Sequence, residues 1–280
     1  MKKLLIGLVT TMAWALAVTT AGTNAGCGSS KGSGGSGGAD GGAGTGGSIP
    51  LTPSDTGFFD GTNAAGILGA WYSYGDWYNP TAAMGDCAIK GGFTADQCSN
   101  IVSPVPGTPF ASSANGMCTN GTVAKVISMA GSTSPDYSDI WGAGIGFDLN
   151  NAGTDDGGTG GKLPYDATSS THTPITGFSF HIDTPPTGGQ MRVEFPTSKI
   201  VGTTDINSAY WGGATANLSP FTKGGDYSFH FKDVGGPMYL TSPTPFDPTM
   251  ILSMQFHVVS NTSSTIPFMY CISNLKALTD

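Results

Sequence analysis

Charged side chains are scarce in this sequence. They make up 11% of the 280 residues, with Arg192 as the only arginine and Glu194 as the only glutamate, and the formal net charge is −8. Binding to nucleic acid depends on cations that neutralise phosphates, and docking on anionic lipid headgroups needs cations as well. We therefore expect no nucleic-acid partner and no direct contact between the folded part and a lipid surface.

Catalytic signatures are missing too. The sequence contains no H-E-x-x-H zinc motif, and the stretch 157–162 departs from a phosphate-binding loop at Asp156 and Leu163. Two G-x-S-x-G matches, around Ser30 and Ser36, lie in a Gly/Ser tract that cannot build the strand-to-helix turn of a nucleophile elbow. We expect no catalytic residue, although a Ser-His-Asp triad stays open because its members need not be close in sequence.

Long apolar runs are confined to the amino terminus. Lys2 and Lys3 precede an apolar stretch from Leu4 to about Val18, and small residues follow. This pattern predicts a secretory signal peptide over residues 1–26. No later window holds 18 apolar residues, so we expect no transmembrane helix.

Cys27 follows this signal directly. The tripeptide Ala25-Gly26-Cys27 is similar to the end of a bacterial lipobox, which predicts lipid attachment at Cys27. Asn24 stands where the lipobox has a Leu-like residue, so ordinary cleavage after Ala25 stays open. Residues 27–53 are rich in Gly and Ser and predict a disordered linker. The layout indicates an exported, lipid-anchored protein at the outer membrane or cell surface, with secretion as the alternative.

The cysteine count agrees with this compartment. Lipid attachment at Cys27 leaves four cysteines, an even number, where disulfides form. Cys87 and Cys98 lie close in a loop-rich stretch, which favours a local pair. Cys118 and Cys271 would then form the second pair. The alternative is that these four are buried free thiols.

Behind the linker, apolar and polar residues alternate with period two, which is typical of half-buried strands. Alternating segments lie at 178–182, 191–195, 227–231 and 254–258, and further strands are expected over 122–129, 143–149 and 268–278. Turns rich in Gly, Pro, Asn and Asp separate them. The pattern predicts one all-β domain over residues 54–280, a β-sandwich.

Several segments of this domain resemble a known family. They are residues 57–61 (GFFDG), 69–76 (GAWYSYGD), 141–150 (WGAGIGFDLN), 165–168 (YDAT), 175–180 (ITGFSF) and 268–275 (FMYCISNL). In this order they resemble galactose-binding-like jelly-roll domains, which include many carbohydrate-binding modules and the CIA30-like group. The leader, tract and domain together resemble myxobacterial-type surface lipoproteins.

The resemblance implies a jelly-roll β-sandwich and sugar binding, and it suggests a structural calcium ion. Asp60 matches the first calcium position of the family. The closing strand has Ser273 and Asn274 where the family carries acidic residues, so Asn274 could offer an oxygen ligand without the charge. The alternative for Asp60 is a turn-capping role.

Sugar binding requires flat aromatic faces with polar groups nearby. Trp77 and Tyr78 precede Asn-Pro, and Tyr210 and Trp211 precede Gly-Gly, so these four rings lie beside loops and are candidate platforms. Tyr72 and Tyr74 are further candidate rings, whereas Trp71 and Trp141 lie in the hallmark segments and are expected to be structural. Core or edge packing is the alternative for each ring.

The polar faces of the alternating strands offer a second candidate site. Arg192 and Glu194 are two residues apart, so both side chains leave one side of the same strand. The other predicted ligand-binding residues on polar faces are His181, Gln255 and His257. The alternative is a solvated outer face with a cross-strand ion pair. Three histidines, with His230 included, lie on three separate strands, which argues against a metal site.

These observations favour a surface lipoprotein that binds a polysaccharide or cell-surface glycan without cleaving it. Aromatic stacking and polar contacts would hold the sugar, and the linker would give reach. One alternative is a structural or adhesion protein of the cell surface that binds no sugar. Another is a secreted polysaccharide hydrolase.

Overall fold

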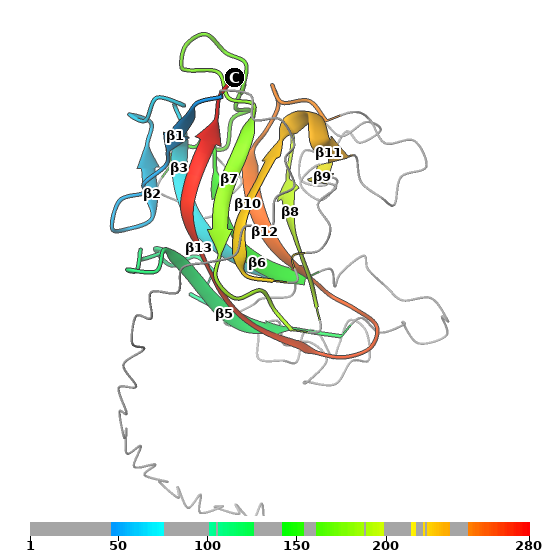
Figure 1. Cartoon of the computed structure of the whole chain (residues 1–280). Helices are drawn as coiled ribbons and strands as arrows, with labels where there is room; N and C mark the ends of the chain where they lie inside the picture. The colour runs from blue at the N-terminus through cyan, green and yellow to red at the C-terminus, as the bar shows by residue number, and fades with distance from the viewer. Residues whose placement is uncertain are drawn as a thin grey trace, which may run out of the picture. The chain divides into compact units, whose positions relative to one another are not determined.

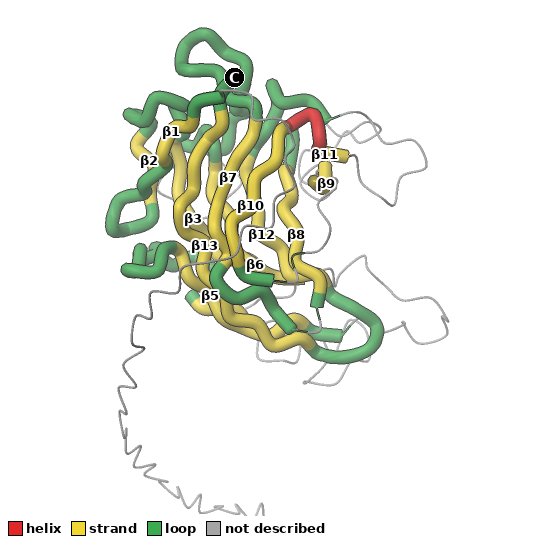
Figure 2. Tube along the Cα trace, in the orientation of Figure 1, coloured by secondary structure: helices red, strands yellow, loops and turns green. Residues whose placement is uncertain are grey.

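The computed structural model describes an all-β sandwich. The described residues are 46–75, 101–104, 106–125, 142–153, 161–187, 189–198, 214–216, 221, 223–235 and 246–280, and they belong to one compact unit, Ala43–Asp280. The one helix in these ranges is the short 3-10 helix η3 (Phe231–Asp233), beside β11 in Figure 2. Within them, no helix has the length and apolar character needed to cross a membrane.

One sheet contains six strands. Its order is β10-β7-β13-β5-β4, and β1 also pairs with β13. The strands are β1 (Ser48–Pro50), β4 (Ile101–Ser103), β5 (Met117–Val123), β7 (Gly177–Ile182), β10 (Gly225–His230) and β13 (Ile266–Leu278). All of their pairings are antiparallel.

The other sheet contains seven strands in the order β11-β9-β8-β12-β6-β3-β2. These are β2 (Phe58–Asp60), β3 (Leu68–Gly75), β6 (Gly142–Asp148), β8 (Gln190–Phe195), β9 (Ala214–Ala216), β11 (Val234–Gly235) and β12 (Ser253–Val259). Its pairings are antiparallel as well.

The chain passes back and forth between the two sheets. Apart from the short strands β4, β9 and β11, from β3 onward it runs through β5, β6, β7, β8, β10, β12 and β13, and each of these strands lies in the opposite sheet from the one before it. Figure 1 shows β13, β7 and β10 in front of β3, β6 and β12. This alternation is the connectivity of a jelly roll. The predicted fold class, an all-β jelly-roll sandwich, is confirmed.

Aromatic side chains fill the space between the sheets. Phe180 of β7 meets Phe256 of β12 edge-on, with ring centroids 4.9 Å apart. Trp71 stacks on Phe256 at 6.1 Å and lies 4.8 Å from Phe147. Trp71 is 1% exposed, so the expectation that it is structural is confirmed. Rings in these tilted and edge-on geometries stabilise a core beyond the area they bury.

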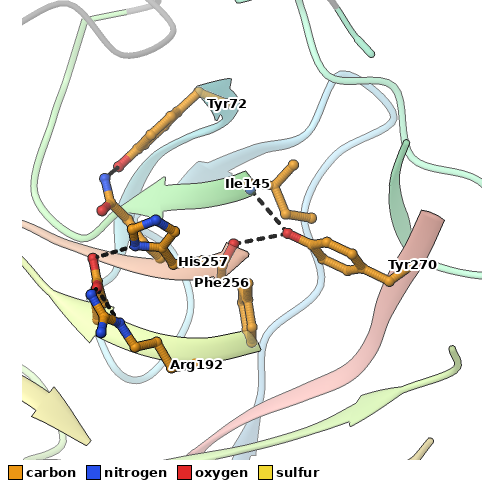
Figure 3. A network of polar contacts seen from close by, with 8 residues as sticks. Tyr72, Ile145, Arg192, Phe256, His257 and Tyr270 are labelled. Carbon is orange, nitrogen blue, oxygen red and sulfur yellow. Dashed lines mark hydrogen bonds and ion pairs between the residues drawn. The ribbon is translucent and has the colours of Figure 1, made fainter. Parts of the chain in front are cut away.

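Tyr270 of β13 ties the two sheets together through hydrogen bonds. Its hydroxyl donates to the carbonyl oxygen of Phe256 at 2.8 Å and accepts from the amide of Ile145 at 3.2 Å (Figure 3). Both of these residues belong to the seven-stranded sheet. Burial raises the pKa of Tyr270, which therefore stays protonated.

Most of the predicted strands are observed. The four alternating segments correspond to β7, β8, β10 and β12, although Phe231 begins η3 instead of ending β10. The strands predicted over 143–149 and 268–278 correspond to β6 and β13. The strand predicted over 122–129 was placed too late, because β5 ends at Val123 and residues 124–125 form no strand.

A disulfide bond and a strand near the start of the described residues complete the fold. Cys118 and Cys271 face each other in the β5–β13 pair and form a disulfide, as predicted. The other predicted disulfide, Cys87–Cys98, and the predicted lipid-attachment residue Cys27 lie outside the described residues. Strand β1 pairs with the end of β13, so the described sandwich begins before the predicted start at residue 54.

Candidate functional site

The candidate site is the outer face of the seven-stranded sheet, formed by outward residues of β3, β6, β12 and β8. The strand registers place these residues in two rows. One row is Tyr74, Gly144, His257 and Arg192, and the other is Tyr72, Gly146, Gln255 and Glu194. Because strands alternate their side chains, the residues between these positions point into the core.

Strand β6 offers only glycine where the two rows cross it. A Cβ atom on Gly146 would lie 2.9 Å from Cγ of Gln255, and one on Gly142 would collide with the imidazole of His257. The missing side chains therefore leave room for two side chains of β12, Gln255 and His257, to lie over β6. A glycine stripe of this kind is a common sign of close approach in a strand.

Glu194 is the centre of a charged network on this face. Its Oε2 lies 2.9 Å from Nδ1 of His257, and its Oε1 accepts a hydrogen bond from Nε of Arg192 at 2.5 Å. Nη2 of Arg192 contacts the same oxygen. Figure 3 shows the carboxylate between the imidazole and the guanidinium. Hydrogen bonds between charged groups are stronger than neutral ones, so this arrangement fixes the Arg192 side chain.

Burial and charge act on Glu194 in opposite directions. Burial alone would raise its pKa, but the charges and hydrogen bonds of His257 and Arg192 outweigh burial and lower the pKa from 4.5 to about 2. The carboxylate is therefore ionised at any physiological pH. It can accept hydrogen bonds but cannot supply a proton.

Two tyrosines complete the face on β3. Tyr72 accepts a hydrogen bond from Nε2 of Gln255 at 3.0 Å, and the ring of Tyr74 stands edge-on to His257 with centroids 6.0 Å apart. Burial raises the pKa of both tyrosines, and Glu194 raises that of Tyr74 further. The Oε1 atom of Gln255 is buried and has no hydrogen-bond partner in the part of the chain that the structure describes.

A buried ion pair lies at the end of β6. Nζ of Lys162 is 2.9 Å from Oδ1 of Asp148, and Nδ2 of Asn151 donates to the other carboxylate oxygen at 2.8 Å. The ammonium also lies 4.5 Å from the ring centre of Tyr72, a cation–π distance. Burial raises the pKa of Asp148, and Lys162 opposes that shift. The pair therefore holds the Tyr72 end of the face in place.

Exposure divides the face into a buried support and a more accessible part. His257 is 1% exposed, Tyr72 3% and Gln255 7%. The side chains of Arg192 and Glu194 are 33% and 13% exposed. The buried groups thus hold Arg192 in position, and Arg192 with Glu194 offers donors and an acceptor to solvent.

The structure brings four of the five predicted polar residues together: Arg192, Glu194, Gln255 and His257. His181 does not join them, because β7 lies in the six-stranded sheet. The predicted ring platforms Trp77, Tyr78, Tyr210 and Trp211 lie outside the described residues. The glycine stripe could have been found in the sequence from the alternating glycines of Gly-Ala-Gly-Ile-Gly-Phe at 142–147. No sequence pattern indicated the Lys162–Asp148 ion pair.

The two residues predicted to bind calcium lie in different strands, Asp60 in β2 and Asn274 in β13. The Asp60 carboxylate accepts hydrogen bonds from the Thr62 hydroxyl at 2.7 Å and the Thr62 amide at 2.9 Å, and these bonds lower its pKa. Asn274 has a positive φ of 52° within β13. Among the residues described, no three His, Cys, Asp or Glu side chains form a group that could hold a metal ion. The calcium site stays a prediction, and no role is derived for the ion.

The sequence matches no family model and no curated protein. Among solved structures, the chain has a similarity to the one titled "Solution structure, dynamics and binding studies of CtCBM11". The identity is 16%, the match covers 58% of this chain and 84% of that chain, and the TM-score is 0.28. At these values the similarity carries no argument about a ligand, and the site rests on the residues of this chain.

Proposed function

We propose that this chain binds carbohydrate without cleaving it, through the side chains of Arg192 and Glu194 on the outer face of the seven-stranded sheet. The observation that carries the proposal is the fixed position of Arg192. A guanidinium and a carboxylate side by side match the hydroxyl pairs of a sugar, since one donates hydrogen bonds and the other accepts them. Both are already held by buried groups, which lowers the entropy lost on binding.

A further set of predicted residues supports this proposal. The predicted rings Trp77, Tyr78, Tyr210 and Trp211 would add stacking faces. Such rings pack against the apolar C–H faces of sugars while polar groups bind the hydroxyls.

The electrostatics of the face argue against cleavage of glycosidic bonds. Glycosidases use a carboxylic acid of raised pKa together with a second carboxyl group. Glu194 has its pKa lowered to about 2 and remains an anion. Asp148, on the same face, is fully buried in its ion pair with Lys162. Neither group on this face is suited to donate a proton to a leaving sugar.

Placement at the cell surface is part of the proposal. The predicted signal peptide, the lipid on Cys27 and the predicted Gly/Ser-rich linker ahead of β1 would display the sandwich away from a membrane. Mass spectrometry of the mature amino terminus tests this placement. A diacylated or triacylated Cys27 supports it, and a chain that begins at Gly26 contradicts lipid attachment.

Affinity electrophoresis in gels that contain neutral polysaccharides tests sugar binding. We expect the wild-type chain to be retarded by at least one polysaccharide and Arg192→Ala to bind about 10- to 100-fold more weakly, as expected for loss of charged hydrogen bonds. Lys276→Ala is the matched control, because Lys276 is exposed on the other sheet. A wild-type chain that no polysaccharide retards, or an Arg192→Ala variant that binds like wild type, contradicts the proposal.

A further inference from the structure

A second group of polar residues lies on the outer face of the six-stranded sheet, whereas Arg192 belongs to the seven-stranded sheet. Asp226 of β10, His181 of β7 and Ser273 of β13 occupy one row across three adjacent strands. The registers pair Asp226 with His181 and His181 with Ser273. Residues directly opposite each other in antiparallel strands have Cβ atoms about 4.5–5.5 Å apart.

The imidazole of His181 is held from one side. Its Nδ1 lies 2.8 Å from Oδ1 of Asp226. This contact leaves Nε2, on the opposite edge of the ring, as the nitrogen that can take a proton from a neighbour. In the described part of the chain, neither Nε2 of His181 nor Oγ of Ser273 makes a hydrogen bond. The acid and the imidazole are therefore in contact, and the hydroxyl lies beside the imidazole in the same row on the next strand.

The backbone is irregular next to the hydroxyl. The β13–β7 register shifts between Ser273 and Lys276, and Asn274 adopts a positive φ of 52°. Ser273 is half-buried and Asn274 is exposed, while Ile272 and Leu275 on either side are buried. The bulge thus turns two consecutive side chains outward. In the part of the molecule that is described, the Asn274 amide also makes no hydrogen bond, and bulges of this kind re-aim side chains near functional sites.

We propose that Ser273, His181 and Asp226 form an acyl-transfer site that hydrolyses carboxylic esters with small acyl groups. This activity goes beyond the proposed sugar binding and uses the opposite sheet. Ser273 is the nucleophile, His181 is the general base and Asp226 is a positioning residue. The Asn274 amide is the side chain available to donate to the oxyanion, a role that asparagine can fill.

The reaction balances without a cofactor. Nε2 of His181 takes the hydroxyl proton while Oγ of Ser273 bonds to the ester carbonyl carbon, and the carbonyl electron pair moves to oxygen. The bond to the alkoxy group then breaks, and His181 returns the proton to the departing alcohol. Water attacks the acyl-serine in the same way. The bond to Oγ breaks, Ser273 regains its proton and a carboxylic acid leaves.

The exposure of the row shapes its expected behaviour. The Asp226 side chain is 85% exposed and that of His181 35%. A solvent-exposed contact of this kind orients the ring only weakly. We therefore expect a slow enzyme, with a smaller effect from Asp226 than from the other two residues. An open face also favours esters that project from a larger molecule.

Labelling with a fluorophosphonate probe tests the site, because this probe reacts preferentially with activated serines. The purified full chain is incubated with the probe, and peptide mass spectrometry locates the adduct. We expect the adduct on Ser273, with none on Ser273→Ala and labelling about 100-fold slower for His181→Gln. Asp226→Asn should slow labelling less, and Asp226→Glu should restore it, which a merely structural role would not explain.

Two matched variants control for changes in the fold. Ser228→Ala removes an exposed hydroxyl from the same face. His230→Gln removes a different imidazole, which lies on β10. Both should label at the wild-type rate and hydrolyse p-nitrophenyl acetate equally well. Absence of an adduct on Ser273 in the wild-type chain overturns the proposal. So does ester hydrolysis that is unchanged in Ser273→Ala.

Discussion

His257 and Glu194 meet across the β8–β12 pair on a diagonal, with Nδ1 and Oε2 2.9 Å apart. The imidazole is buried, whereas the side chain of Glu194 is 13% exposed on the outer face of the sheet. Through Glu194, this contact connects the buried His257 to Arg192, the one arginine of the chain. The stability and the binding behaviour of the face therefore depend on the same carboxylate.

The lowered pKa of Glu194 predicts a dependence of stability on pH. A carboxyl group with a folded-state pKa of about 2 and an ordinary value of 4.5 stabilises the folded state above about pH 4.5. This contribution is lost as pH falls from 4.5 toward 2. Glu194→Gln removes the titrating group, so its free energy of unfolding should fall less steeply than that of wild type over this range. Urea unfolding at several pH values measures both slopes, and equal slopes would contradict the network.

The glycine stripe of β6 predicts a large effect from one methyl group. A Cβ atom on Gly144 would collide with the carbonyl oxygen of Phe256 and approach the Tyr270 hydroxyl at 3.0 Å. We expect Gly144→Ala to lower the free energy of unfolding by about 3 kcal/mol or more, because backbone must move.

Gly107 is the control for that substitution. Its φ is 86°, and nothing lies within 4 Å of a Cβ atom placed there. Gly107→Ala should therefore cost only the backbone strain, about 1–2 kcal/mol. Urea denaturation compares the two variants. Equal losses would show that the space over Gly144 is not limiting.

The Tyr270 hydroxyl is expected to stabilise the sandwich measurably. Tyr270→Phe leaves the amide of Ile145 and the carbonyl of Phe256 without this partner in the core, at a cost of about 1–3 kcal/mol. Tyr227→Phe removes a hydroxyl that bonds the Lys223 carbonyl near the surface, so it should cost less than about 1 kcal/mol. Thermal unfolding of both variants measures the difference, and a Tyr270→Phe variant as stable as Tyr227→Phe would argue against the link between sheets.

The Cys118–Cys271 disulfide spans a sequence separation of 153 residues. Closing so long a loop restricts the unfolded chain, and its removal should lower the free energy of unfolding by about 2–5 kcal/mol. The double variant Cys118→Ser, Cys271→Ser is compared with wild type in urea. Reductant should destabilise the wild-type chain more than it destabilises the variant. A double variant of unchanged stability would mean that β5 and β13 hold together without the bond.

Strands with a strong contrast between their faces could be predicted from sequence. In β7 and β8 apolar residues alternate with polar ones, and both strands lie close to their predicted positions. Strand β5 has no such contrast, because its sequence MCTNGTV is mostly polar and contains glycine. The predicted strand was therefore placed over the more apolar residues that follow β5. Strand β1 carries Ser48 and Pro50 and looked like linker, since proline in a strand is confined to edges and first positions.

From the sequence, only the relation between site residues on the same strand could be predicted. That Arg192 and Glu194 share a face follows from period two, and the structure confirms it. Which strands are neighbours depends on pairing between distant segments. His181 and His257 look alike in sequence, yet one lies in β7 and the other in β12, in different sheets. No local pattern carries that information.

The pairing of β1 with the end of β13 has a consequence for engineering. The amide of Thr279 donates to the carbonyl of Gly47 at 2.9 Å, so the two ends of the described sandwich lie one strand spacing apart. A short peptide could join them, and new ends could be opened in an exposed turn, since domains with adjacent ends tolerate circular permutation. For the same reason, the sandwich could be inserted into a hairpin loop of a host protein without separating the two host strands.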